Sequence, residues 1–169
     1  LTQSGEAYKA RFLIDASGQD CLLGTLKGTK KSNPNFSPRM AVSNQWAGAQ
    51  LDSTLIKGGL RIIHLEGEKN GWLWMIPVAE NKLSVGVVTE NAYFRQRKKE
   101  LAGMSDNWRL DYYRQEVFST ALGERILSRA TLLNDVEING DYSYHNADSY
   151  GEYYAAIGDA SKFLDPMFA

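Results

Sequence analysis

The stretch best suited to chemistry lies late in the chain, at Gly158-Asp159-Ala160, after a short apolar run from Tyr153 to Ile157 that predicts a strand. The glycine lets the backbone approach a ligand closely, and the Asp159 carboxylate can accept hydrogen bonds from sugar hydroxyls. Pro166 follows shortly and could begin a helix whose free N–H groups face an electron-rich ring or an anion. A β-turn after a core strand accounts for the same residues, so spacing alone leaves both interpretations open.

Two tryptophans form the second candidate. Trp72 and Trp74 lie two positions apart in Gly71-Trp72-Leu73-Trp74-Met75-Ile76-Pro77, so on a strand both indoles point to one face. Two neighbouring indoles make a large, rigid apolar wall, which can bound a substrate pocket or belong to a core. Pro77 cannot donate a ladder hydrogen bond, so the strand is expected to end or to meet an edge there.

A weaker signal lies near the start of the chain. The apolar residues Phe12-Leu13-Ile14 run into the turn Asp15-Ala16-Ser17-Gly18, and a strand ending in small residues is typical of the edge of an α/β ligand crevice.

The remaining reactive residue types give no site. His64 and His145 are the only histidines, and each is interpreted as a packed or surface residue rather than a base. Together with the single cysteine, Cys21, they have no metal-ligand spacing, and Cys21 has no neighbouring base or second thiol that would activate it.

Short strands joined by turns predict the scaffold that positions these residues. Between Arg39 and Glu90, apolar segments at 40–46, 60–65, 72–77 and 83–89 alternate with turn signals, which predicts an antiparallel meander. Helices are predicted over 92–102 and 107–122, with Gly123 as a stop signal. Residues 24–38 predict a long loop whose lysines, Lys27, Lys30 and Lys31, are solvated.

Composition excludes several classes of protein. The chain has 169 residues, 43% hydrophobic and 23% charged, which is ordinary for a folded globular domain. A formal net charge of -1 gives no reason to expect nucleic acid or an acidic membrane as a partner, and no apolar run approaches a membrane span. One cysteine permits no internal disulfide, so we expect a reducing, cytoplasmic setting.

Taken together and in order, the three motifs resemble flavin-dependent halogenases of the tryptophan type, within the FAD monooxygenase superfamily. The Trp-x-Trp-x-Ile-Pro element at 72–77 is that family's signature, whereas the Gly-Asp element at 158–159 belongs to the whole superfamily. The Asp-Ala-Ser-Gly turn at 15–18 is weak by itself, but the three anchors in register cover nearly the whole chain.

The resemblance implies an α+β fold: a mainly antiparallel-sheet substrate domain with helices, flanked by pieces of an α/β FAD-binding domain like that of p-hydroxybenzoate hydroxylase. Residues 1–24 would end the FAD domain, 25–148 would form the substrate domain, and 149–169 would return to the FAD domain. The FAD-binding residues implied are the following: Asp15, Ser17, Gly18, Gly158, Asp159, Ala160 and Pro166.

The resemblance also implies the reaction. The full-length parent would use reduced FAD, oxygen and halide to form hypohalous acid, which halogenates an aromatic small molecule, with a separate flavin reductase as electron source. Trp72, Trp74, Ile76 and Pro77 would line the passage between flavin and substrate and keep the organic substrate from the flavin.

Two departures accompany the resemblance. The glycine-rich dinucleotide fingerprint is missing, and with it the lysine on which halogenation depends, which normally lies before the Asp-Ala-Ser-Gly turn; none of Lys9, Lys27, Lys82 and Lys162 takes that role. Ala169 stands where the family has the first of two serines beside the halide. We therefore expect an internal fragment that is inactive alone and binds FAD weakly or not at all.

Two other functions remain open from the sequence. One is an FAD-dependent monooxygenase or reductase on the same scaffold, and the other is a binding module without turnover. The catalytic residue, the substrate, the halide and the oligomeric state are not predicted.

Overall fold

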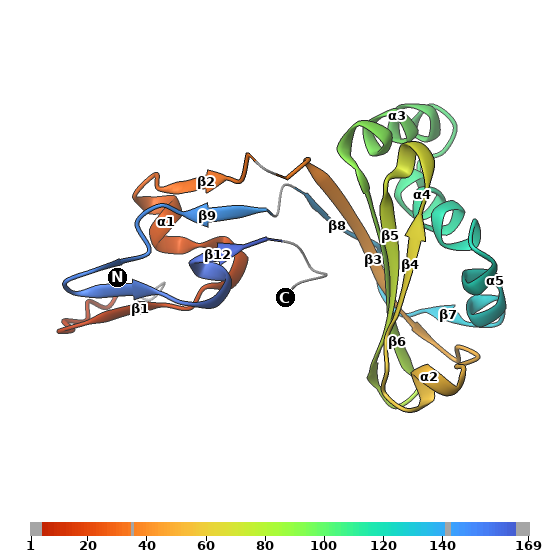
Figure 1. Cartoon of the computed structure of the whole chain (residues 1–169), viewed down its shortest axis with the longest axis horizontal. Coiled ribbons are helices and arrows are strands. Elements are labelled where there is room, and N and C mark those ends of the chain that lie inside the picture. The colour runs from red at the N-terminus through yellow and green to blue at the C-terminus, as the bar shows by residue number, and fades with distance from the viewer. Residues whose placement is uncertain (1–4, 35, 141–142, 165–169) are drawn as a thin grey trace. The chain divides into compact units, whose positions relative to one another are not determined.

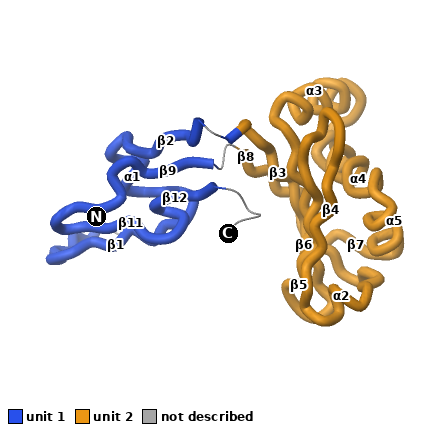
Figure 2. The backbone as a smooth tube through the Cα atoms, in the orientation of Figure 1, with its two compact units in different colours: residues 1–36, 141–169 blue, residues 37–140 orange. Residues whose placement is uncertain are grey.

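The computed structural model describes residues 5–34, 36–140 and 143–164. The chain folds as two compact units, one made of residues 1–36 and 141–169 and the other of residues 37–140 (Figure 2). The predicted domain boundaries, after residues 24 and 148, refer to the domains of a parent protein and stay a prediction.

The unit of residues 37–140 is built on one antiparallel sheet. Strand order is β4-β5-β6-β3-β7, with β8 pairing β3 as well. The strands are β3 Arg39–Ala47, β4 Arg61–Leu65, β5 Gly71–Ala79, β6 Lys82–Glu90, β7 Thr131–Leu132 and β8 Glu137–Gly140. The α-helices are α2 Ser53–Ile56, α3 Asn91–Ala102, α4 Trp108–Phe118 and α5 Ala121–Leu127, with a 3-10 turn, η2, at Gly67–Lys69. The predicted α+β class with a mainly antiparallel sheet is confirmed.

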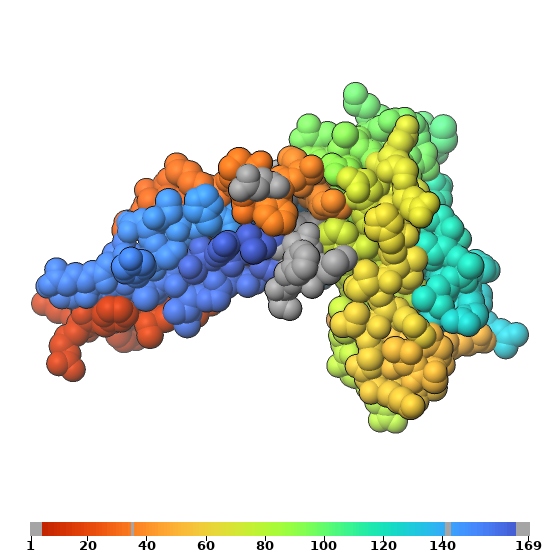
Figure 3. Space-filling model, viewed as in Figure 1, coloured from red at the N-terminus to blue at the C-terminus, as the bar shows by residue number. Residues whose placement is uncertain are grey.

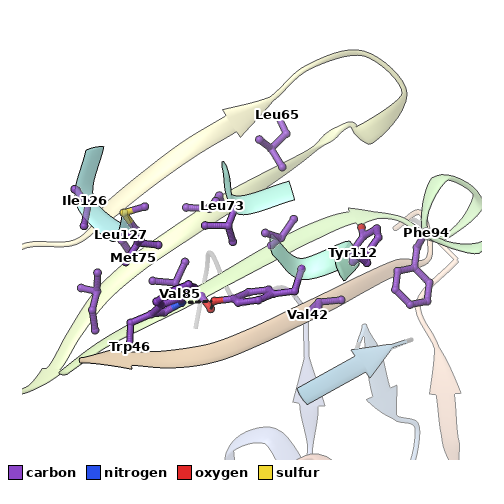
Figure 4. Close-up of a cluster of buried hydrophobic side chains, with 14 of the residues drawn as sticks. Val42, Trp46, Leu65, Leu73, Met75, Val85, Phe94, Tyr112, Ile126 and Leu127 are labelled. Atoms are coloured by element: carbon purple, nitrogen blue, oxygen red, sulfur yellow. Dashed lines mark hydrogen bonds between the residues drawn. The ribbon is translucent and has the colours of Figure 1, made fainter. Parts of the chain in front are cut away.

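The main core lies between this sheet and helices α3, α4 and α5, which follow one of its sides (Figure 1). Alternate residues of the strands supply it, because successive side chains point to opposite faces. Figure 4 shows this cluster, in which the Trp46 indole N–H donates to the Tyr113 hydroxyl at 2.7 Å. The Tyr113 hydroxyl in turn donates to the Val85 carbonyl at 2.9 Å. Strands and helices are therefore joined by a buried hydrogen-bond chain as well as by apolar packing.

The predicted helix over 107–122 is two helices. α4 ends at Phe118, and the Thr120 hydroxyl accepts a hydrogen bond from the Gly123 N–H at 3.0 Å, which caps the start of α5. Gly123 therefore lies inside a helix and is not the stop signal that the sequence indicated. A Cβ on Gly123 would lie 2.1 Å from the Val117 carbonyl oxygen, so glycine is needed here for close packing of the two helices.

The second unit holds two small sheets, ordered β1-β11-β10 and β12-β9-β2. Its strands are β1 Leu13–Asp15, β2 Lys30–Ser32, β9 Tyr144–Asn146, β10 Tyr150–Gly151, β11 Tyr154–Ala156 and β12 Lys162–Phe163. Helix α1 is Leu22–Leu26, and the 3-10 turns are η1 Gly18–Asp20 and η3 Gly158–Ala160. The predicted loop over 24–38 is thus wrong in part, because β2 forms there by pairing with β9. No helix within the described residues is long and apolar enough to cross a membrane.

Candidate functional site

Two of the predicted cofactor turns meet at one sheet edge. β1 and β11 run parallel and adjacent, with Asp15 opposite Ala156, so both strands end on the same side. The Ile157 N–H donates to the Asp15 carbonyl at 2.9 Å, and the turns η1 and η3 contact each other. Segments far apart in the sequence therefore form one surface at the carboxyl ends of parallel strands, where α/β proteins bind their ligands.

Asp15 and Ser17 are both engaged within this edge. The buried Asp15 carboxylate accepts hydrogen bonds from the N–H groups of Ser17 at 3.0 Å and Leu23 at 2.7 Å. The Ser17 hydroxyl accepts one from the Leu22 N–H at 2.8 Å. Burial favours the neutral carboxyl, but the hydrogen bonds from Ser17 and Leu23 outweigh it and lower the pKa of Asp15. Both side chains thus hold the start of α1.

The glycines allow the two turns to bend in the same way. Gly18 and Gly158 have φ angles of 63° and 56°, in the left-handed region that side chains disfavour, and no atom lies within 4 Å of a Cβ built on either. The fully buried Cys21 thiol donates to the Ala160 carbonyl at 3.1 Å. Cys21, which the sequence indicated to be inert, therefore ties one turn to the other.

Asp159 is placed differently from Asp15. Its side chain is half-buried, and within the described residues its carboxylate has no hydrogen-bond or ion-pair partner. Its backbone carbonyl accepts a hydrogen bond from the Tyr144 hydroxyl at 2.7 Å. Burial raises the pKa of Tyr144 to about 12, so this hydroxyl stays protonated and keeps donating at neutral pH. The turn is held by its backbone, which leaves the Asp159 carboxylate available to a ligand.

The fit of FAD to this edge can be compared residue by residue. Asp159 can accept hydrogen bonds from sugar hydroxyls, and the open side of Gly158 lets a ligand approach the backbone, so both fit the cofactor. Asp15 and Ser17 already accept hydrogen bonds from the backbone at the start of α1, and their predicted role in binding FAD stays a prediction. Pro166, the last residue implied by the resemblance, lies outside the described residues.

The tryptophan motif lies on β5, which pairs with the edge strand β4 on one side and with β6 on the other. Leu73 and Met75 of β5 point into the helix-covered core, so Trp72, Trp74 and Ile76 point to the opposite face, as predicted from their spacing. Trp74 has Ile62 of β4 and Gly86 of β6 as cross-strand neighbours. We call this side of the sheet, opposite the helix-covered core, the tryptophan face. It carries Ala41, Ser43, Gln45, Ile62, His64, Trp72, Trp74, Ile76, Ser84, Gly86 and Val88.

The two indoles differ in environment. Trp72 is only 7% exposed, and the Arg39 guanidinium lies 5.0 Å from its ring centroid, a cation–π contact. Arg39 is held by the Asn70 carbonyl at 2.5 Å and by Glu90 at 3.8 Å. Trp74 is half-buried and lies across β6. Of the two indoles, Trp74 therefore has the more exposed ring surface.

Ser84 and Gly86 are the residues that sequence reasoning missed. A Cβ on Gly86 would lie 2.1 Å from Cζ2 and 2.2 Å from Cη2 of Trp74, so the six-membered ring lies directly over the Gly86 backbone. The Trp74 indole N–H donates to the Ser84 hydroxyl at 3.2 Å. A lone glycine within an apolar strand was the available signal, because it often marks a close approach of another group.

Ile76 and Pro77 continue the motif toward the end of β5. Ile76 is 37% exposed beside Ile62, which is 41% exposed on the edge strand β4. The pairing of β4 with β5 ends at Met75 of β5, so at Pro77 the strand β5 has only β6 as a neighbour. The register between β5 and β6 is irregular between Pro77 and Ala79. This agrees with a proline at an edge, although the strand continues to Ala79. The segment around β4 (yellow in Figure 3) forms part of the visible surface.

Hollows in the described surface of this unit include a small and a larger one. A small polar one, of about 90 Å³, lies beside Ser84 and is lined also by Ser43, Gln45 and Glu137. A larger groove, of about 600 Å³, lies between the start of α4 and residues 132–136. Asn134 lines both, and its carbonyl accepts a hydrogen bond from the buried Asn44 side chain at 2.7 Å.

The histidines are not brought together. His64 is exposed on β4 opposite Trp72, and His145 lies on β9 between Lys31 and Lys162 of the neighbouring strands. Over the part of the chain that the structure describes, no group of three or more His, Cys, Asp and Glu side chains could hold a metal ion.

Comparison with known proteins shows which proteins this chain is similar to in sequence and in structure. A flavin-dependent halogenase from Armillaria mellea is 31% identical over 170 residues, which cover 94% of this chain and 31% of that protein. A 1H-pyrrole-2-carbonyl peptidyl-carrier-protein chlorinase from Pseudomonas fluorescens is 28% identical, covering 95% of this chain and 34% of that protein. Among solved structures, the flavin-dependent halogenase CmlS superposes with a TM-score of 0.77 at 24% identity, over 98% of this chain and 28% of that one. No protein-family model matches the chain.

The homologues of this chain are therefore flavin-dependent halogenases, a tryptophan halogenase among them, at 25–31% identity over most of its length. The resemblance stated from the sequence motifs is confirmed, and FAD is a cofactor of the family. The chain spans about a third of the length of the curated relatives that it matches.

Proposed function

We propose that this chain forms the substrate domain, with adjoining pieces of the FAD domain, of a flavin-dependent halogenase that acts on an aromatic small molecule. Trp72 and Trp74, which share the face of the sheet opposite the helix-covered core, are the observation that carries the proposal. When bound, reduced FAD supplies the electrons with which oxygen and halide yield hypohalous acid. A separate flavin reductase is the proposed source of those electrons.

The residues of this chain would bind and separate the reactants. Asp159 would accept hydrogen bonds from the ribityl or ribose hydroxyls, because its carboxylate is free of other partners within the described residues. Trp74, helped by the buried Trp72, would act as an apolar wall that excludes the organic substrate and water from the flavin. Neither indole can transfer a proton in such a role, so bulk rather than polarity is its contribution.

The direct test uses the complete enzyme with FAD, a flavin reductase and a panel of indoles, pyrroles and phenols. We expect product masses that shift with the halide supplied, chloride against bromide. Oxygenated products that do not depend on halide would identify a monooxygenase on the same scaffold and would refute the proposal. Binding of FAD without consumption of oxygen would indicate a module without turnover.

A second experiment tests the wall. Trp74→Phe should be milder than Trp74→Ala, because phenylalanine keeps more of the apolar bulk. The measured quantity is the ratio of halogenated to hydroxylated product, which should fall for Trp74→Ala. The exposed His64→Ala on the same face serves as a control that removes a side chain without opening the wall. An unchanged ratio in Trp74→Ala would return the indole to a purely structural role.

We also propose that the 169-residue chain alone binds FAD weakly. The Leu22 and Leu23 N–H groups at the start of α1 already donate to the Ser17 hydroxyl and the Asp15 carboxylate, so they are not free to hold a pyrophosphate. Titration of flavin fluorescence against the purified chain should show no saturation at micromolar concentrations. Submicromolar affinity would refute this proposal while leaving the halogenase function open.

A further inference from the structure

We infer that Ser84 and Gly86 of β6 form a seat that fixes the Trp74 indole flat against the sheet, and that they are positioning residues for this tryptophan. The functional part of the inference rests on the proposed halogenase function, whereas the seat itself is a property of the fold. In the register of β5 with β6, Trp74 lies directly opposite Gly86, and Ile76 lies opposite Ser84.

Gly86 provides the space. Three atoms of the Trp74 indole lie within 2.5 Å of the position that a Cβ on Gly86 would take, which no side chain tolerates. The neighbouring strand residue on the other side, Ser43, is small as well. The indole can therefore lie over the backbone of β6 instead of standing away from the sheet, and any side chain larger than hydrogen at position 86 would lift it.

Ser84 provides the direction. The indole has a single hydrogen-bond donor, and here it points along β6 to the Ser84 hydroxyl at 3.2 Å. This contact selects one of the two ways in which the ring can lie flat, because a flipped indole would point its N–H away from Ser84. A fixed orientation matters for a wall, since a swinging ring would alternately open and close the passage beside it.

The contrast with Trp72 makes the seat specific. Trp72 lies opposite Val88, is 7% exposed and is covered by Arg39, so packing alone restrains it. Trp74 has open ring surface, and without its seat it would be the freer of the two. β6 thus carries glycine and serine where the exposed indole lies, and valine where the buried one lies.

The test is fluorine NMR of the 169-residue chain labelled with 5-fluorotryptophan, whose four signals are assigned by single Trp→Phe variants. Gly86→Ala should displace the Trp74 signal further than the other three, because the far end of the indole must move. Ser84→Ala should shift or broaden the same signal, and Ser84→Thr, which keeps the hydroxyl, should restore it.

Gly103→Ala is the matched control. Gly103 has an ordinary backbone conformation, and a Cβ there would meet its nearest atoms at 3.6 Å, so all four signals should stay in place. Unchanged Trp46 and Trp108 signals would show that Gly86→Ala is folded. If Gly86→Ala fails to fold, the pair Ser84→Ala and Ser84→Thr decides. A Trp74 signal that ignores Ser84→Ala, or four signals that move alike in either variant, would overturn the seat.

Measurements on the complete enzyme distinguish the seat of Trp74 from the role of Trp74 as a wall. Gly86→Ala should lower the ratio of halogenated to hydroxylated product several-fold, whereas Gly103→Ala should not change it. A displaced Trp74 signal with an unchanged product ratio would confirm the seat and refute the wall, and with it the proposed role of Trp74. An unmoved Trp74 signal would refute the seat whatever the product ratio.

Discussion

The two faces of the antiparallel sheet are formed by the same strands but differ in how deeply their side chains are buried. On the helix-covered face, Val42, Trp46, Leu73, Met75 and Val87 are all at most 2% exposed. On the tryptophan face, glycine and serine lie beside Trp74, and Ile62 and Ile76 are more than a third exposed. The first face gains stability from close packing, while the second leaves part of the Trp74 ring and the Ile62 and Ile76 side chains accessible.

Hydrogen bonding differs between the faces in the same sense. The Trp46 indole N–H is satisfied by Tyr113, which also bonds to Val85, so the donor lies inside a closed buried chain. The Trp74 indole N–H is satisfied by one serine on the neighbouring strand. A tryptophan can thus serve the core or a ligand surface with the same chemistry, and its surroundings decide which.

The largest expected effect on stability comes from removing a tryptophan on the helix-covered face. Trp46→Ala should lower the free energy of unfolding by about 3–5 kcal/mol, because it removes a fully buried indole and leaves a cavity. Urea denaturation followed by circular dichroism measures this loss. A loss below about 1 kcal/mol would show that the helix-covered face is not the main core.

Removing the hydroxyl of Tyr113 tests the buried hydrogen-bond chain. Burial raises the pKa of Tyr113, so its hydroxyl stays protonated, and Tyr113→Phe leaves the Trp46 N–H without its partner. We expect a loss of about 1–3 kcal/mol from the free energy of unfolding. The exposed Tyr8→Phe is the matched control and should change stability by less than about 0.5 kcal/mol.

Trp74→Ala gives the counterpart on the tryptophan face. Because part of this indole is already exposed, its removal should cost on the order of 1 kcal/mol, well below the cost for Trp46→Ala. The same urea titration, run on both variants, gives the difference directly. Equal losses would remove the distinction between a core tryptophan and a ligand-facing one.

The smallest expected effect on stability comes from the Asp52 carboxylate at the start of α2. The Asp52 carboxylate caps α2 through the N–H groups of Leu55 and Thr54 and pairs with Arg61 at 2.9 Å. The hydrogen bond from Leu55, helped by Arg61, lowers the pKa of Asp52 below its ordinary value of 3.8. Its contribution to stability is therefore complete above that value and is lost as the pH falls through the lowered pKa.

Asp52→Asn isolates this charge, since asparagine can still cap the helix. The variant should lose slightly less stability than the wild type between pH 5 and the acid limit, as measured by melting temperature against pH. Amide exchange around α2 should change with it, while the Trp74 environment should not. Identical acid profiles for the two proteins would assign the acid sensitivity to other carboxylates.

The sequence by itself determined the local features of this protein. The strands from Arg39 to Glu90 follow their apolar patterns, and a spacing of two placed Trp72 and Trp74 on one face because side chains on a strand alternate. Only the tertiary structure decided which face the helices cover, since both faces of β5 carry large apolar residues. The break in the helix predicted over 107–122 is local instead: Thr120 caps α5 through the Gly123 N–H three residues later, a start signal that the sequence analysis missed.

At the candidate site, too, the sequence predicted the local turns but not the contacts between them. The residue types at 15–18 and 158–160 marked both turns, but their meeting depends on the parallel pairing of β1 with β11, which joins distant segments. In the part of the chain that the structure describes, the Asp15 carboxylate accepts hydrogen bonds at this edge, whereas the Asp159 carboxylate has no hydrogen-bond or ion-pair partner. The seat of Trp74 arises from the register between β5 and β6. That register depends on the tight turn between Ala79 and Lys82 and on the irregularity between Pro77 and Ala79, and the sequence pattern did not reveal the irregularity.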